Sequence, residues 1–228
     1  MYNSNAFKTS LCLLVCVTSL TCCTSSEEPD DFTKLKKFES ELSQMCTLHP
    51  EMRCYTQLKV GLARGHVVSI NIDGHGRGGQ GLNQLPKSIY QFQYLEEFSL
   101  LSTAFEQLPD LKQFKNLRKV TITYNTFKGP VHLKNLPPSI EDLMLSRDGI
   151  KEIIVDDSLP HLSGFDLTQN LMEGRINSTF CKLPNLQFLD ISSGCCLSDM
   201  EQTRRANAAK EVLCKKDVGV SANRSFID

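Results

Sequence analysis

The sequence predicts an α/β solenoid with a parallel β-sheet on its concave face, irregular or 3-10 segments on its convex face, and helical caps. Five segments place apolar residues at relative positions one, four and six, and they start at Leu95, Leu117, Ile140, Leu162 and Leu186. A less regular sixth copy starts at Val67, so successive copies begin 28, 22, 23, 22 and 24 residues apart. A fixed period of roughly 20–29 residues predicts stacked units that each supply one strand.

The apolar positions of neighbouring copies should stack into two continuous rows, because one unit alone cannot bury its apolar edge. The first row is Phe98, Val120, Leu143, Phe165 and Leu189. The second row is Leu100, Ile122, Leu145, Leu167 and Ile191. Each fully buried aliphatic side chain contributes roughly 1.5–3 kcal/mol, so these rows should form the core. The residues between them should face solvent, since side chains alternate along a strand.

The segments that return between strands also repeat. A leucine followed by proline recurs at Leu85, Leu108, Leu136, Leu159 and Leu183. Proline has a fixed φ and no N–H, which suits an irregular convex segment. Two copies also share the motif Asn, apolar, Gly, apolar, in NTFKGPV from Asn125 and NLMEGRI from Asn170.

With these motifs, residues 65–194 resemble about six plant-type extracellular leucine-rich repeats, whose pattern is LxxLxLxxNxLxGxIPxxI. In that family the repeat asparagine satisfies backbone groups at the turn. Thr103, Asp148 and Gly194 stand at the equivalent positions here, so we expect looser turns there. In plant-type proteins a helix and a cysteine pair precede the repeats, and this chain resembles that arrangement without the usual tryptophan.

Both ends of the array carry helical patterns. Residues 24–64 are predicted as an N-terminal helical cap, with one apolar face made by Phe32, Leu35, Phe38, Leu42 and Met45. Residues 195–228 are predicted as a C-terminal cap and tail, because Ser198 and Glu201 form a capping box before good helix formers.

Residues 1–23 are predicted to be a cleaved signal peptide, which makes the protein secreted and extracellular. Lys8 precedes an apolar run of ten residues from Leu11 to Leu20. That run is shorter than the roughly 18–20 residues of a spanning helix and falls within the 7–15 of a signal core. A buried N-terminal strand and an uncleaved anchor are the alternatives. Leu20 to Cys23 also faintly resembles a bacterial lipobox, which would give surface association.

Cysteine usage agrees with export. Six cysteines lie outside the signal, near the two ends of the array: Cys46, Cys54, Cys181, Cys195, Cys196 and Cys214. We predict disulfides, for which six cysteines allow 15 pairings. Proximity favours Cys46 with Cys54, and Cys214 with Cys195 or Cys196, which leaves Cys181 for the other. A metal site is the alternative, but the ligand spacings typical of zinc are missing and the five histidines are scattered. Two glycosylation motifs occur, at Asn177 and Asn223.

No catalytic or cofactor-binding residues are predicted. The segment GHGRGG from Gly74 satisfies the G-x-G-x-x-G pattern, but Leu85 and Pro86 follow where a dinucleotide site needs a helix. Adjacent acids such as Asp156 and Asp157 point to opposite faces if they lie on a strand. A net charge of −1 gives no general attraction to nucleic acid. A mean hydropathy of −0.22 argues against a polytopic membrane protein.

The concave face is the candidate binding surface. We predict that a protein or peptide partner contacts a mildly acidic strip with apolar spots, made by Asn71, Asp73, Glu97, Ser99, Leu101, Thr121, Thr123, Asp142, Met144, Asp166, Thr168, Phe188 and Asp190. This set contains five acids, and Lys119 is the one base expected on the same face. Charge should therefore steer a basic partner to it. The alternatives are an accessory or inhibitory protein of a polysaccharide-degrading enzyme, an enzyme acting on a cell-surface polymer, and an architectural role.

The signal-peptide prediction is tested on the protein purified from its natural source. We expect its first residue to lie beyond Leu20, because the signal peptidase cuts after the apolar core. We also expect its six remaining cysteines to be oxidised. N-terminal sequencing and thiol titration measure both, and an intact Met1 with six free thiols would contradict the prediction.

Overall fold

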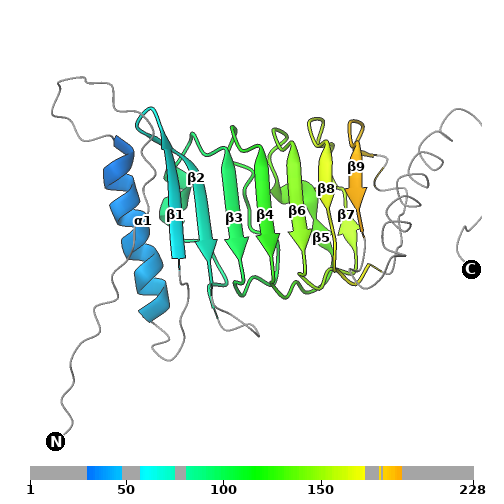
Figure 1. Ribbon diagram of the computed structural model, residues 1–228, viewed down its shortest axis with the longest axis horizontal. Helices are drawn as coiled ribbons and strands as arrows, with labels where there is room; N and C mark the ends of the chain where they lie inside the picture. The colour runs from blue at the N-terminus through cyan, green and yellow to red at the C-terminus, as the bar shows by residue number, and fades with distance from the viewer. Residues whose placement is uncertain (1–29, 48–56, 75–80, 173–179, 181, 192–228) are drawn as a thin grey trace, which may run out of the picture.

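The computed structural model describes residues 30–47, 57–74, 81–172, 180 and 182–191, and within them it shows a solenoid of parallel strands (Figure 1). One sheet has the strand order β1-β2-β3-β4-β6-β8-β9. Six of its strands run parallel: β2 (His66–Asp73), β3 (Glu97–Leu101), β4 (Lys119–Thr123), β6 (Asp142–Ser146), β8 (Gly164–Asp166) and β9 (Phe188–Asp190). The predicted fold class is confirmed at this level, as a solenoid of parallel strands.

Strand β1 (Gln57–Ala63) was not predicted, since we placed these residues in a helical cap. It pairs antiparallel with β2, and Arg64 and Gly65 connect the two strands with φ values of 52° and 81°. Two consecutive positive φ angles are typical of the tight turns that match the twist of a hairpin. The strand forms because Leu58 and Val60 alternate with exposed neighbours and enter the core.

Helix α1 (Asp30–Thr47) lies at the β1 end of the sheet (Figure 1). Its residues Leu35, Phe38 and Leu42 join the hydrophobic core, and the Phe38 ring meets Phe92 edge-on at 5.7 Å. The predicted apolar face is therefore buried at these three positions, but the prediction is wrong at Phe32, which is 39% exposed, and Met45 is only partly buried. The predicted C-terminal cap lies outside the described residues.

Two carboxylates fix the helix to the solenoid. Asp31 Oδ2 accepts the Val67 N–H at 2.8 Å, and Glu41 Oε2 accepts the N–H and hydroxyl of Ser88 at 3.0 and 2.7 Å. Burial by itself would raise the pKa of Asp31, but the hydrogen bonds from Lys34 and Val67 hold that pKa below its ordinary value. Both carboxylates thus bond backbone N–H groups of the solenoid to the helix.

The return segments form the second layer of the solenoid. They contain the 3-10 helices η1 (Lys87–Gln91) and η2 (Leu133–Asn135) and a short parallel sheet of β5 (Val131–His132) and β7 (Ile153–Ile154). The leucine before each proline is buried at Leu108, Leu136, Leu159 and Leu183. This layer packs against the main sheet through one continuous hydrophobic cluster.

Both predicted apolar rows are buried. The five residues of the first row are at most 2% exposed and the five of the second at most 6%. Strand register explains this, because Phe98 lies beside Val120, Val120 beside Leu143, and so on along the sheet. The core is therefore a stack of equivalent side chains, with Leu167 and Ile191 of the second row lying just after the ends of β8 and β9.

A second repeated feature is a left-handed residue just after four strands. Ser102, Tyr124, Arg147 and Gln169 have φ between 52° and 61°. Thr103, Asn125, Asp148 and Asn170 follow these four residues, and hydrogen bonds join each turn to its neighbour in the stack. Asn170 Oδ1 accepts the N–H groups of Asp148 and Ile150, at 3.0 and 3.1 Å, and Asn125 Oδ1 accepts the Thr103 hydroxyl at 2.6 Å.

Asp148 takes part in this ladder although it is an acid. Its Oδ1 accepts the backbone and side-chain N–H groups of Asn125, at 2.8 and 3.1 Å, whereas its Oδ2 is buried without a hydrogen-bond partner. Thr103 is buried and bonded as well, so the expectation of looser turns is not met at either position. Gly194 lies outside the described residues.

A pair of neighbours on β6 tests the face assignment. Leu145 is fully buried in the second row and Met144 is 37% exposed on the other face of the strand. We expect Leu145→Ala to lower the free energy of unfolding by about 2–5 kcal/mol, and Met144→Ala by less than about 1 kcal/mol. Urea unfolding followed by circular dichroism measures both, and equal losses would show that the faces are wrongly assigned.

Asp148 predicts a pH dependence of stability. Burial raises its pKa from 3.8 to about 7, although the N–H groups of Asn125 oppose the shift. The unfolded chain releases this proton near pH 4 and the folded chain near pH 7, so the folded state binds more protons between them. Stability contributed by Asp148 therefore falls as pH rises from 4 to 7 and levels off above. We expect Asp148→Asn to abolish this fall.

The measurement is the unfolding free energy of both proteins from pH 4 to pH 8. The variant should gain on the order of 2–4 kcal/mol relative to wild type by pH 8, and little at pH 4. Asp157→Asn is the matched control, because Asp157 is exposed and its substitution should leave the difference flat. A variant-to-wild-type difference that is constant with pH would contradict the account.

Candidate functional site

The face of the sheet turned away from the core is here called the open face, and it is the surface that the sequence predicted as concave. Side chains reach it from alternate positions of each strand, because neighbours along a strand point to opposite sides. The parallel register lines these positions up in three columns. The central column is Asn71, Ser99, Thr121, Met144, Asp166 and Asp190, as expected from the sequence.

The two outer columns differ in how far they follow the prediction. The column Ser69, Glu97, Lys119, Asp142, Gly164 and Phe188 is in register along its whole length. The other column is in register only for Asp73, Leu101, Thr123 and Ser146. Thr168 lies beyond the end of β8, and its N–H donates to Asp166 Oδ1 at 2.8 Å.

Thr123 is a correction. We placed it on the solvent-facing strip, but it is only 6% exposed. Its short side chain lies between Leu101 of β3 and Ser146 of β6, which are in register on its two sides. A partner on the open face would therefore touch little of Thr123.

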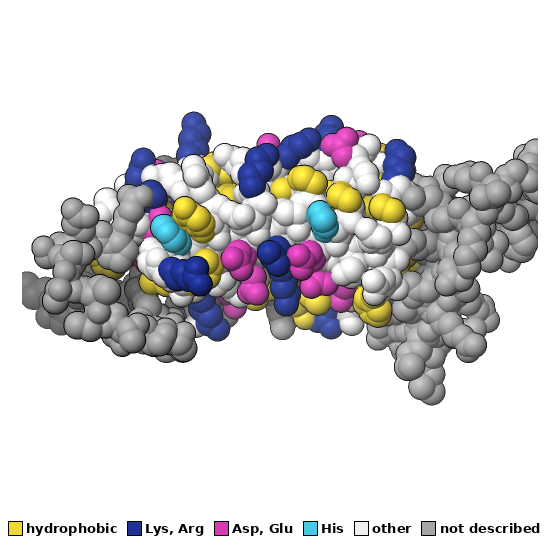
Figure 2. Space-filling model, turned by 90° about the horizontal axis from the view of Figure 1, so that it is seen from above, with side chains coloured by type: hydrophobic (Ala, Val, Ile, Leu, Met, Phe, Trp, Pro, Cys, Tyr) yellow, Lys and Arg dark blue, Asp and Glu magenta, His cyan; other side chains and the backbone are white. Residues whose placement is uncertain are grey.

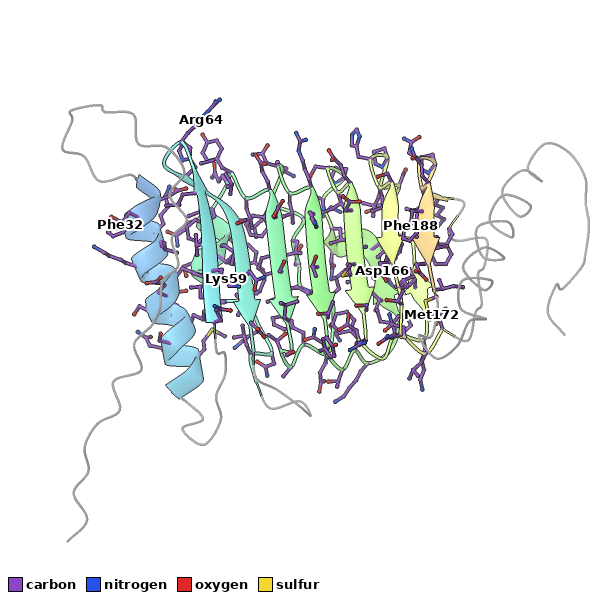
Figure 3. All side chains as sticks on the ribbon, in the orientation of Figure 1. Phe32, Lys59, Arg64, Asp166, Met172 and Phe188 are labelled. Atoms are coloured by element: carbon purple, nitrogen blue, oxygen red, sulfur yellow. The ribbon has the colours of Figure 1, made fainter. Side chains whose placement is uncertain are left out.

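Strand β1 adds residues to the open face that the sequence reasoning missed. Lys59 is exposed and pairs with Asn71, so it extends the central column by one strand (Figure 3). The signal was present in the alternation of Gln57 to Val60 and in the Arg64-Gly65 turn. It was hidden because an antiparallel hairpin strand is not a copy of the repeat.

The charge on the described open face is predominantly acidic. Its five acids are Asp73, Glu97, Asp142, Asp166 and Asp190, and its bases are Lys59 and Lys119. Equivalent positions on neighbouring strands lie about 4.8 Å apart. Asp166 and Asp190 are direct neighbours in register, so the acids concentrate toward the β9 end of the sheet.

Two large apolar side chains interrupt this acidic surface. Phe188 is 51% exposed and Met144 is 37% exposed. Both line a hollow of about 300 Å³ on the open face. Its other lining residues are Lys119, Thr121, Asp142, Gly164, Asp166 and three residues of the first core row, Val120, Leu143 and Phe165. Figure 3 shows Asp166 and Phe188 on the neighbouring strands β8 and β9. The open face therefore combines carboxylates and exposed apolar groups in one place.

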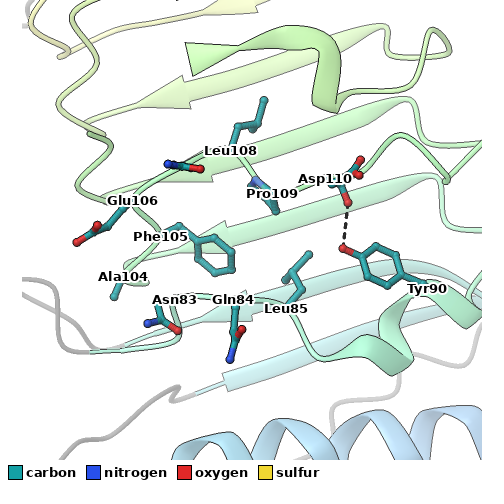
Figure 4. A pocket seen from close by; sticks show the side chains of 11 residues that line it. Asn83, Gln84, Leu85, Tyr90, Ala104, Phe105, Glu106, Leu108, Pro109 and Asp110 are labelled. Atoms are coloured by element: carbon teal, nitrogen blue, oxygen red, sulfur yellow. Dashed lines mark hydrogen bonds between the residues drawn. The ribbon is translucent and has the colours of Figure 1, made fainter. Parts of the chain in front are cut away.

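A larger hollow of about 540 Å³ lies between return segments (Figure 4). Tyr90 and the 104–110 segment border it, and the Tyr90 hydroxyl donates to the Asp110 carbonyl at 3.1 Å. It has two carboxylates, Glu106 paired with Lys128 and Asp110 accepting the Lys112 N–H, against five acids on the open face. Charge therefore selects a ligand less strongly here than on the open face.

The edge at which the parallel strands begin carries charges of both signs. Figure 2 shows acidic and basic side chains interspersed along it, with apolar side chains among them. Arg118 and Glu141 form one ion pair there, at 3.4 Å. A mixed edge gives weaker steering of a charged partner than a surface of one sign.

Other predicted sites receive no test from the described residues. Cys46 belongs to α1 but its side chain is not described, and Cys54, Cys181, Cys195, Cys196, Cys214, Asn177 and Asn223 lie outside the described ranges. Within those ranges, no three His, Cys, Asp or Glu side chains are grouped so that they could hold a metal ion. No helix of the described segments has the length and hydrophobicity to cross a membrane.

Comparison with known proteins gives no relative. The chain matches no protein-family model, no curated protein and no solved structure. The case for its function therefore depends on its own residues and geometry.

Proposed function

We propose that this protein is a secreted leucine-rich repeat protein that binds a protein or peptide partner through its open face. The observation that carries the proposal is the open face itself. Its outer-column residues Glu97, Asp142 and Phe188 are exposed, while the return segments pack on the opposite side of the sheet. A partner can therefore reach this face without any rearrangement of the described elements.

The turn ladder supports the leucine-rich repeat assignment. In the family pattern an asparagine follows the strand and satisfies backbone groups. Here Asn125 Nδ2 donates to the Thr123 carbonyl at 3.1 Å, and Asn170 Nδ2 donates to the Leu167 carbonyl at 2.9 Å. In both copies the asparagine amide thus satisfies a backbone carbonyl near the end of its own strand, two residues back for Asn125 and three for Asn170.

The composition of the open face favours binding over turnover. Its acids are distributed over five strands, and the exposed apolar groups lie among them. Such a surface supplies steering by charge and burial of apolar area, which are the requirements of a protein interface. Export, as the N-terminal segment predicts, would give the partner an extracellular location.

Charge reversal on the open face tests the proposal. The mature protein is immobilised, a partner is captured from the extracellular fraction and identified by mass, and the purified partner is then measured by surface plasmon resonance. We expect Glu97→Lys with Asp190→Lys to raise its Kd at least tenfold, because like charges across an interface cost several kcal/mol and about 1.4 kcal/mol is tenfold. Neither residue lines the open-face hollow of about 300 Å³, which is called below the hollow at Gly164.

The matched control reverses two exposed acids of a return segment, Glu152→Lys with Asp157→Lys. Asp157 pairs with Lys112 at 3.4 Å across the surface, and an exposed ion pair contributes little to stability. This control should bind as wild type. Binding that survives the open-face change would refute the proposal, and binding that is lost only in the control would place the interface on the return segments.

A further inference from the structure

The hollow at Gly164 has a chemical preference of its own. We propose that it binds one arginine side chain of the partner, with the guanidinium between the Asp142 and Asp166 carboxylates and the Phe188 ring. This inference rests on the proposed function and deepens it, because it names the group that the open face recognises.

Gly164 creates the space. A Cβ on Gly164 would lie 2.6 Å from Asp142 Oδ1, so the carboxylate of Asp142 lies over the backbone of the neighbouring strand. The φ of Gly164 is outside the left-handed range, so the backbone conformation does not demand glycine there. What demands it is the close approach of Asp142, and any larger residue would push that carboxylate out of the hollow.

Phe188 supplies an aromatic wall. It is the register partner of Gly164 on the next strand, so a residue without a side chain lies directly beside an exposed ring. Met144 borders the hollow in the central column and is also exposed. The lining of the hollow thus combines two apolar groups, the Phe188 ring and the Met144 thioether, with the carboxylates of Asp142 and Asp166.

Arginine fits this combination better than the other side chains. Its guanidinium is planar, remains charged, stacks on aromatic faces and donates two parallel hydrogen bonds to a carboxylate. A neutral apolar side chain would remove water from the carboxylates without pairing them, which is costly. A volume of about 300 Å³ lies at the lower limit of small-molecule sites, which suits one side chain and not a larger ligand.

Lys119 provides a further test of the arginine site. It pairs in register with Asp142 and also lines the hollow, on the side of β4. Its ammonium is the cation nearest along that column and lowers the negative potential felt by an incoming guanidinium. Removing this charge should therefore strengthen the binding of a cation such as arginine, whereas it would leave a neutral apolar side chain almost unaffected.

The experiment uses the full mature protein labelled with ¹³C at its methionine methyl groups and with ¹⁵N. The probe is a capped Gly-Ser-Arg-Ser-Gly peptide, and the same peptides with citrulline or lysine in place of arginine are comparisons. Citrulline has almost the same shape but no charge. We expect saturable shifts of the Met144 methyl and the Gly164 amide with the arginine peptide, weaker shifts with lysine, and none with citrulline.

Four variants locate the contact. Phe188→Leu and Asp142→Asn should each weaken binding of the arginine peptide at least about threefold, since one removes a cation–aromatic contact and the other a charged hydrogen bond. Lys119→Gln should strengthen it. Glu152→Gln removes an exposed acid of a return segment, on the opposite side of the sheet, and should leave the affinity unchanged. Equal shifts with arginine and citrulline, or no change on Phe188→Leu, would overturn the proposal.

The remaining outcomes separate this inference from the proposed function. If the Glu97→Lys with Asp190→Lys variant loses the partner but the arginine peptide leaves Met144 and Gly164 unshifted, the arginine site is refuted and the docking face stands. If the peptide binds at the hollow but the partner is indifferent to that double variant, the docking face is refuted. Signals of Met144 that move with protein concentration alone would assign the hollow to a second copy of the chain and also overturn the arginine site.

Discussion

Register between parallel strands is the constraint on which the rest of this structure depends. Because β2, β3, β4, β6, β8 and β9 pair in register, each core residue lies beside its equivalent, as Phe98 lies beside Val120. A slip of one residue would exchange the two faces, moving both apolar rows into solvent and the carboxylates into the core. The free energy that the rows gain by burial therefore fixes the register, and the register in turn fixes the columns of the open face.

The turns between the strands preserve this register with backbone conformations of raised energy. Ser102, Tyr124, Arg147 and Gln169 adopt positive φ, which non-glycine residues rarely do, so the surrounding hydrogen bonds must hold the backbone there. The ladder of Thr103, Asn125, Asp148 and Asn170, of which the first three are buried, supplies hydrogen bonds between successive turns. Asp148 shows how strongly the position demands an acceptor, since a buried carboxyl is retained there although burial disfavours its charged form.

The sequence was sufficient for the parts of the fold that repeat. Period and apolar spacing predicted both core rows and the central column, because every copy carries the same information. It was insufficient where the structure departs from the repeat. Strand β1 is antiparallel and has no copy elsewhere, and the burial of Thr123 depends on the side chains of its two neighbouring strands. The hollow at Gly164 was missed for the same reason, because only strand pairing shows that Asp142 lies over the glycine and Phe188 stands beside it.

A solenoid separates stability from recognition along each strand. Leu143 and Leu145 of β6 are buried in the core rows, whereas Asp142 and Met144, one position before each, are exposed on the open face. Substitutions at the exposed positions change charge and shape without creating a cavity, so they alter recognition with little effect on stability. The hollow illustrates what such freedom permits, since one glycine on β8 both admits a carboxylate from β6 and leaves the Phe188 ring of β9 accessible. Three strands thereby line one hollow, the proposed arginine site, without any departure from the register that holds the core.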